Sequence, residues 1–212
     1  MMGKQPVPPL SGKEKVRLDS TRKIIIAAEQ VFARKGFEGA TTREIADQAG
    51  LPKANVHYYF PTKEDLYVQV LKDILAEWIS DAEIFDSSDD PETAFRAYIA
   101  RKIQHSFTRP HGSKVWAMEV IGGGKVFDVH LKSSLLEWNA KKIGQINKWI
   151  EEGKLRKVNA QYLLYSLWAM TQHYADFEYQ TRIINDGHSL GLEQSDAIVE
   201  NIVQLVLRGV LN

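Results

Sequence analysis

Apolar side chains recur every three or four residues along most of this chain, the spacing that places them on one face of an α-helix. Examples are the apolar positions of residues 24–32, the stripe at residues 66–78 and the face of residues 198–206. No segment alternates apolar and polar residues convincingly enough to indicate a β-strand. The pattern therefore predicts an all-α fold.

Caps and helix breakers give the boundaries of these helices. The first helix is predicted to begin near Asp19 or Ser20, either of which is a suitable N-cap, and to end at Gly36. Later helices are predicted over residues 63–85, 91–107, a shorter segment ending at Gly122, and residues 126–152, 160–185 and 193–211.

Residues 41–67 contain two short predicted helices joined by a tight turn. Thr41 and Glu44 have the spacing of a capping box, and Gly50 stands where a left-handed residue closes the first helix. Pro52 suits the first turn of a second helix over residues 53–59. Such a helix-turn-helix inserts its second helix into the DNA major groove.

The sequence GFEGATTREIADQAGLPKANVHYYFPTKEDLY, residues 36–67, resembles the DNA-binding signature of the TetR family of transcriptional regulators. Pro52 departs from the Ser or Thr that is usual in the family at this position. The resemblance implies a helix-turn-helix DNA-binding domain over residues 19–66 and an effector-binding and dimerisation domain over residues 67–212. Residues 1–18, with several prolines and lysines, are predicted to form a basic flexible arm that follows phosphates or is a plain tail.

Within this motif, exposed long or polar groups are expected to contact bases, and groups at helix ends are expected to position phosphates. Val56 and Tyr59 are expected to turn inward or towards a neighbouring helix. The candidate DNA-binding residues are Thr42, Lys53, Ala54, Asn55, His57, Tyr58, Tyr59 and Lys63.

Charge is distributed unevenly along a chain whose formal net charge is zero. Residues 1–63 hold 11 Lys and Arg against 6 Asp and Glu, a balance of +5, and the remainder has a balance of −5. An uneven solvated surface gives the same numbers, but here the positive part coincides with the helix-turn-helix. The asymmetry favours a nucleic-acid partner for the N-terminal third.

A second informative segment is WAMTQHYADF, residues 168–177. Trp168 and Gln172 share a helix face, and a Gln amide beside an aromatic face suits a flat polar ligand such as a cyclic amide. The simpler alternative is a buried Gln bonded to a backbone group. The segment also resembles the TetR branch that includes the pyrimidine-catabolism regulator, which implies uracil or thymine as effector. The candidate ligand-binding residues by this resemblance are Trp78, Tyr98, Lys102, Trp168 and Gln172.

Other chemistry finds little support in the sequence. Cys is absent and no two of the six His lie three or four residues apart, so a metal site is not expected, and neither is a cofactor. The sequence Gly122-Gly123-Gly124-Lys125 lacks the spacing of a phosphate-binding loop and reads as a helix connection. Two alternatives stay open: a small-molecule-binding helical enzyme, and a DNA-binding architectural protein without an effector.

The sequence thus predicts a ligand-responsive, TetR-type transcriptional repressor and not an enzyme. The last two helices are apolar over a wide arc, which predicts a homodimer through a four-helix bundle. Two heads in a dimer imply an inverted-repeat operator in double-stranded DNA. No apolar run approaches the length of a membrane span and no signal peptide is evident, so a cytoplasmic protein without a membrane partner is expected.

Overall fold

The computed structural model describes residues 11–211 and confirms the predicted all-α fold. The described residues contain no β-strand, only an isolated bridge between Leu155 and Leu211. The chain divides into two compact units, residues 1–70 and residues 71–212. The boundary falls inside helix α4, Lys63–Asp81. Over residues 11–211, no helix is both long and apolar enough to cross a membrane.

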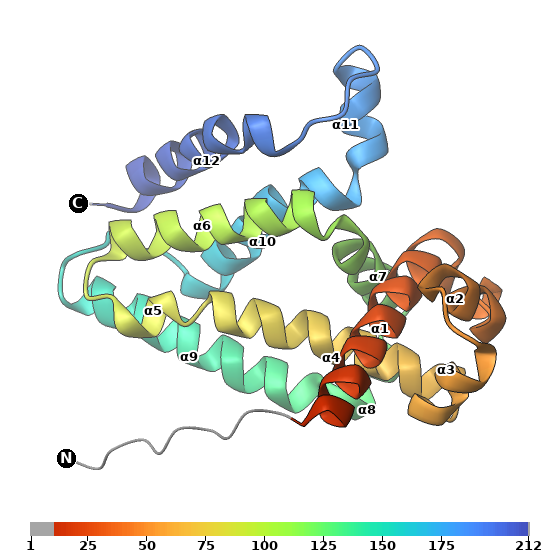
Figure 1. The fold of residues 1–212 in the computed structure, drawn as a ribbon. Coiled ribbons are helices and arrows are strands. Elements are labelled where there is room, and N and C mark those ends of the chain that lie inside the picture. Colours follow the sequence, from red (N-terminus) through yellow and green to blue (C-terminus); the bar gives the residue numbers. More distant parts are fainter. Residues whose placement is uncertain (1–10, 212) are drawn as a thin grey trace. The chain divides into compact units, whose positions relative to one another are not determined.

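The first unit is built around a small apolar core. Its largest fully buried side chains include Ile24, Phe32, Ile45 and Leu66, and Phe32 packs edge-on against Tyr67 with ring centroids 4.9 Å apart. These residues come from different helices, so the core fixes the short helices against the first one. The helices of this unit are α1 (Gly12–Gly39), α2 (Thr42–Ala49), α3 (Lys53–Tyr59) and the start of α4 (Figure 1).

Helix α1 begins at Gly12, so the prediction of a start near Asp19 or Ser20 was wrong. Ser11 caps it: the Ser11 hydroxyl accepts a hydrogen bond from the Glu14 amide, and the Glu14 carboxylate accepts one from the Ser11 amide at 2.8 Å. This capping box stabilises a helical turn in residues 12–18, which were predicted to belong to a flexible arm. The rest of that predicted arm, residues 1–10 with Lys4, lies outside the described residues. At the other end, Gly36 leaves helical geometry with φ +69°, although helical structure continues to Gly39.

The turn between α2 and α3 has the caps that the sequence predicts. Thr41 and Glu44 form the reciprocal capping box, and Gly50 closes α2 with φ +65° while its amide donates to the carbonyls of Ala46 and Asp47. At the start of α4 the Thr62 hydroxyl and amide both donate to the Asp65 carboxylate. The backbone groups at these helix ends are therefore paired, which holds the two short helices in a defined geometry.

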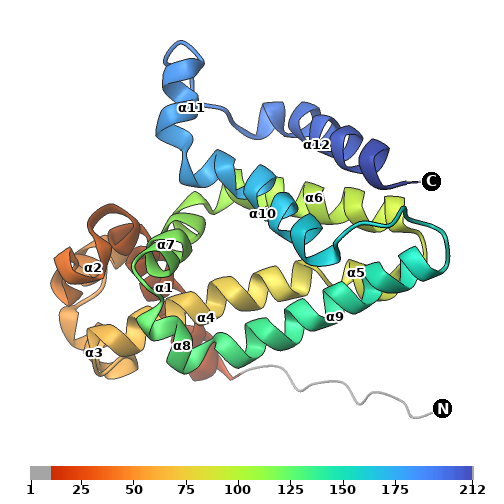
Figure 2. The same ribbon diagram turned by 180° about the vertical axis from the view of Figure 1, so that it is seen from behind.

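The second unit packs α10 and α12 against α6, around a core that also includes Phe85, Phe95 and Trp149. Seen from behind, α9 lies beside α5 at one end of the unit, and α11 extends outward between α10 and α12 (Figure 2). The helices are α5 (Ile84–Ser87), α6 (Pro91–Thr108), α7 (Pro110–Ile121), α8 (Lys125–His130), α9 (Lys132–Glu151), α10 (Ala160–Asp176), α11 (Glu178–Ile184), the 3-10 turn η1 (Leu192–Gln194) and α12 (Ser195–Val210).

Three of the helices predicted as continuous are broken. The helix predicted over residues 126–152 changes direction at Leu131, whose side chain is thereby buried. The helix predicted over residues 160–185 ends at Asp176, and Phe177 leaves helical geometry before α11. Helix α4 likewise ends at Asp81, short of residue 85. Each break lies within an apolar pattern that would continue the helix, so packing in the unit decides it.

Candidate nucleic-acid interface and ligand cavity

Helix α3 presents most of the predicted DNA-reading side chains to solvent. Lys53, Ala54 and His57 are exposed, and Tyr58 is 79% exposed. Val56 is fully buried, as predicted, because it packs α3 into the first unit. Asn55 and Tyr59 are half-buried. An apolar anchor on one side and exposed polar groups on the other are what a recognition helix requires.

The candidates for phosphate contact lie at helix ends. Thr42 is the first residue of α2 and is half-buried, directly after the capping Thr41. Within the described part of the chain, the exposed side chains of Arg43 and Lys53 form no ion pair with a carboxylate. Free cations beside helix N-termini suit contacts with a phosphate backbone. A role in DNA binding for these residues stays a prediction.

Lys63 occupies a different environment from the one that the sequence suggests. Its ammonium donates to the carbonyls of Phe37 at 2.6 Å, Ala40 at 3.1 Å and Glu38 at 3.3 Å. It also lies 4.4 Å from the centroid of the Phe37 ring. An ammonium has three donors, and all three find acceptors at the end of α1. This geometry gives Lys63 a structural role, and phosphate contact by Lys63 stays a prediction.

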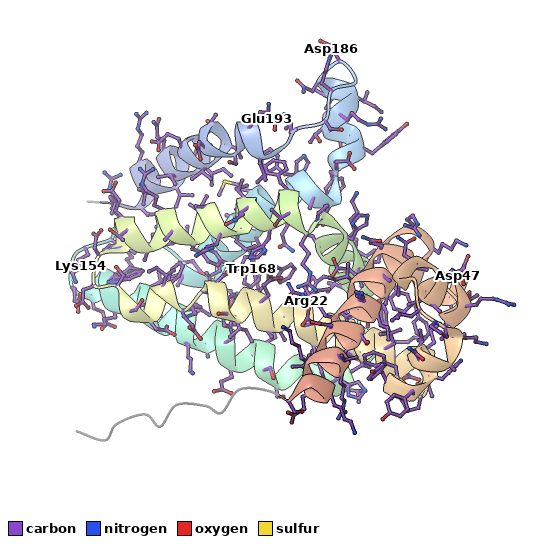
Figure 3. All side chains as sticks on the ribbon, in the orientation of Figure 1. Arg22, Asp47, Lys154, Trp168, Asp186 and Glu193 are labelled. Carbon is purple, nitrogen blue, oxygen red and sulfur yellow. The ribbon has the colours of Figure 1, made fainter. Side chains whose placement is uncertain are left out.

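A cavity of about 470 Å³ lies within the second unit. Helices α4, α6, α7, α8, α9 and α10 all contribute to its wall, and four of the five tryptophans of the chain line it. Figure 3 shows Trp168 in the interior of this unit, whereas Asp186 lies at the outer tip beyond α11. All five residues predicted to bind a ligand line this one cavity: Trp78, Tyr98, Lys102, Trp168 and Gln172. Their role in ligand binding stays a prediction.

The aromatic wall is held rigid by ring contacts and one hydrogen bond. Trp78 meets Trp116 edge-on with centroids 5.0 Å apart, and Trp138 stacks on Trp168 at 5.7 Å. The Trp168 indole N–H donates to the Tyr98 hydroxyl at 3.1 Å. Burial raises the pKa of Tyr98, so its hydroxyl keeps its proton and is available as a donor. Flat, fixed aromatic faces of this kind suit a flat ligand.

Lys102 places a cation in this apolar wall. Its side chain is 3% exposed, and its ammonium lies 3.7 Å from the centroid of the Trp78 ring. Burial lowers the pKa of Lys102 to about 7, an effect that the carboxylates of Asp176, Asp81 and Glu77 partly oppose. The charge of this side chain is therefore sensitive to what fills the cavity.

A row of polar contacts, which includes the ion pairs of Arg109, connects α4 with the C-terminal end of α6 beside the cavity. Arg109 lies 2.5 Å from the Glu77 carboxylate and 2.7 Å from that of Asp73. His105 lies between Glu77 at 3.5 Å and Asp81 at 2.5 Å. The three carboxylates are four residues apart on α4 and so face α6 together. This row fixes the position of α4 in the wall of the cavity.

Sequence reasoning missed part of the cavity wall, notably Trp116, Phe127, Leu135 and Trp138. These residues come from α7, α8 and α9, and the folding of the chain brings these helices to the cavity. The high tryptophan content was a signal for Trp116 and Trp138, but nothing in the sequence pointed to Phe127 or Leu135. Among the described residues, no cluster of three or more His, Cys, Asp or Glu is placed to hold a metal ion.

Comparison with known proteins matches the two units separately. Residues 24–70 match the family model "Bacterial regulatory proteins, tetR family", and residues 71–212 match "YcdC-like protein, C-terminal region". The chain is 32% identical to the HTH-type transcriptional regulator RutR of Escherichia coli K12 over 201 residues, 94% of this chain and 95% of the relative. It is 28% identical to the HTH-type transcriptional repressor NicS of Pseudomonas putida over 150 residues, 69% of each chain.

Solved structures of transcriptional regulators share the fold at low identity. The ketosteroid transcriptional regulator KstR2 of Mycobacterium tuberculosis gives a TM-score of 0.71 at 17% identity, covering 91% of this chain and 95% of that one. AibR, solved in complex with isovaleryl coenzyme A and operator DNA, gives a TM-score of 0.68 at 14% identity, covering 88% and 97%.

Proposed function

Because this chain belongs to the tetR family of bacterial regulatory proteins, whose members bind operator DNA and respond to small molecules, we propose that it is a repressor released by a flat metabolite. The observation that carries the proposal is the convergence of five predicted ligand residues from three helices on one aromatic cavity. The DNA target of such a repressor is an inverted repeat, and its place of action is the cytoplasm.

We expect helix α4 to couple ligand binding to DNA binding. Its first turn belongs to the helix-turn-helix unit, and its later residues Leu75, Trp78 and Ile79 line the cavity. A ligand weakens DNA binding only if it favours a position of this helix that the DNA-bound form does not. A coupling of about 1–3 kcal/mol would lower operator affinity by roughly 5–150-fold.

Family members act as dimers, and the last helices of this chain offer a surface for that contact. Tyr162 and Tyr165 on α10 are 66% and 51% exposed, and Leu205 on α12 is 63% exposed. Both helices also bury apolar residues against α6, so their apolar arc exceeds what a single chain needs. A two-fold bundle of α10 and α12 from two subunits would cover these side chains.

The effector proposed first is a pyrimidine base or a closely related ring. The support is the likeness to RutR, the pyrimidine-utilisation regulator, together with Gln172 in the cavity wall. A carboxamide donates and accepts at once, which matches the adjacent N–H and C=O of a cyclic imide. The cavity faces of Trp78 and Trp168 provide the apolar surfaces for such a ring.

Replacing Gln172 with alanine is expected to weaken the ligand by about 1–3 kcal/mol, because the polar edge of the ring loses its partner inside an apolar cavity. That corresponds to roughly a 5–150-fold higher concentration of uracil or thymine for half-release of operator DNA. Operator affinity without ligand should not change. The measurement is a titration of uracil and thymine into protein–operator complexes followed by fluorescence anisotropy.

Gln180→Ala is the matched control, because Gln180 is exposed on α11 and does not line the cavity. It should release DNA at the wild-type ligand concentration. If Gln172→Ala also does, then Gln172 is a structural residue and the ligand binds elsewhere.

Replacing Asn55 with alanine is expected to relax sequence preference at particular base pairs, with about 1–3 kcal/mol of discrimination lost at each position that Asn55 reads. Asn55 is half-buried on α3, and its side-chain amide has the donor and acceptor that a bidentate contact to adenine requires. Selection from a randomised operator library, read by sequencing, measures this preference. An unchanged preference would show that Asn55 does not contribute to the recognition of base sequence.

A further inference from the structure

Among the described residues of the cavity wall, Lys102 is the charged side chain that is almost completely buried. It is 3% exposed, and within residues 11–211 its ammonium makes no hydrogen bond and no ion pair. The ammonium lies over the face of Trp78, 3.7 Å from the ring centroid. Lys142 is also buried, but it is paired with Asp86 at 2.8 Å.

The three carboxylates that favour the charged form of Lys102 each lie beside another polar group. The Glu77 carboxylate lies 2.5 Å from Arg109, and the Asp81 carboxylate lies 2.5 Å from His105. On α10, Asp176 accepts a hydrogen bond from Ser113 at 2.6 Å. These groups favour a charged Lys102 from a distance but do not contact it. Within residues 11–211, the charged form of Lys102 therefore has no carboxylate in direct contact.

An unpaired buried cation is costly, and an anion that binds beside it offsets part of that cost. We infer that the effector of the regulator proposed above is a flat-ring compound that carries one carboxylate, with Lys102 as its counter-ion. This inference rests on the proposed function in one respect, that the cavity is the effector site. Under it, uracil and thymine are weaker ligands than a related ring bearing a carboxylate.

The size and lining of the cavity agree with such a ligand. Its 470 Å³ corresponds to roughly fifteen water volumes, which leaves room for a substituent beyond one six-membered ring. The tryptophan faces provide the walls for the ring, and Gln172 provides a neutral polar contact. Lys102 binds the carboxylate of this ligand, and an ammonium–carboxylate contact is stronger than one between neutral groups.

The test is calorimetric titration of the dimeric protein with pairs of probes that differ in charge and share a ring. The pairs are uracil-6-carboxylate with its methyl ester, and benzoate with benzamide; uracil and thymine are titrated beside them. In the wild type at pH 6.5, the acid of at least one pair should bind about tenfold or more tightly than its neutral counterpart.

Lys102→Met keeps the length of the side chain and removes the charge, and it should reduce the preference for the acid to about onefold. The variant should remain folded, because replacing an unpaired buried charge with an apolar group is commonly neutral or stabilising. Lys142→Met is the control: it also removes a buried lysine, but Lys142 does not line the cavity, so the preference should persist.

The outcomes separate this inference from the proposed function. Equal binding of acid and neutral probe in the wild type, a preference for the neutral probe, or no binding of either acid would overturn the inference. A preference for the acid that survives in Lys102→Met would overturn the role of Lys102. Binding of uracil without binding of any acid would leave the pyrimidine proposal intact and overturn the inference. Binding of acids without binding of uracil would support the inference and overturn the pyrimidine proposal. Because the wild-type pairs already test charge, the inference stays falsifiable even if Lys102→Met does not fold.

Discussion

Replacing Lys63 with methionine is expected to destabilise the helix-turn-helix unit by about 1–3 kcal/mol, because the carbonyls of Phe37, Glu38 and Ala40 lose their common donor. In a unit of this size, such a loss is a large share of the total stability. Operator binding should weaken for all sequences alike, as a consequence of the loosened fold. Hydrogen exchange of the amides in residues 12–70 measures the loss within this unit, separately from the rest of the chain.

Lys53→Met is the matched control, since Lys53 is exposed on α3 and has no carboxylate partner among the described residues. It should leave hydrogen exchange unchanged and reduce the slope of log affinity against log salt by about one, the signature of one lost phosphate contact. The reverse pattern for Lys63→Met, with unchanged exchange and a reduced slope, would show that Lys63 contacts phosphate as the sequence suggested.

The helix-turn-helix could be predicted from the sequence because its caps act locally. Thr41 and Glu44 are three residues apart and satisfy each other, and Gly50 needs only its own left-handed conformation. The same local signal exists at Ser11 and Glu14, where the prediction nevertheless favoured an irregular arm on account of the prolines at residues 6, 8 and 9. A capping box followed by a helical pattern was the better guide there.

The breaks at Leu131 and Phe177 could not be predicted in the same way. Both lie in segments whose apolar spacing suits a continuous helix, and neither is a glycine or a proline. Leu131 is buried where the chain turns between α8 and α9, and this burial depends on the packing of the second unit as a whole. The spacing of apolar residues identifies which face of a helix is apolar. Where the helix ends depends on the other helices against which that face packs.

The lining of the cavity could likewise be predicted only where its residues are close together in the sequence. Trp168 and Gln172 lie one turn apart on α10, so the sequence alone places them on one face. Trp116 and Trp138 join them only because α7 and α9 fold against α10 and α4. The burial of Lys102 without an ion pair among the described residues could not be predicted in this way, since lysine is ordinarily exposed.

Affinity for benzoate is expected to depend strongly on pH if Lys102 is the counter-ion. Burial lowers the pKa of Lys102 to about 7 in the empty cavity, and a bound carboxylate raises it. Below pH 7 the ammonium is already charged, so the dissociation constant should be nearly constant. Above pH 7 each binding event must also take up a proton, so the dissociation constant should rise about tenfold per pH unit, or roughly a hundredfold from pH 7 to pH 9.

Benzoate is the suitable probe because its carboxylate stays ionised over this range, which leaves the protein as the source of any change. Titration calorimetry in buffers of different ionisation enthalpy reports the proton uptake directly, near zero at pH 6 and approaching one at pH 9. Lys102→Met should bind weakly with a flat profile, since any remaining slope belongs to the other titratable groups that line or border the cavity. Those groups are Glu77 and Asp81 on α4, Tyr98 and His105 on α6, Arg109 at the end of α6, Asp128 on α8 and Asp176 on α10. An affinity of the wild type that is independent of pH between 6 and 9, with no proton uptake, would show that Lys102 does not pair with the carboxylate.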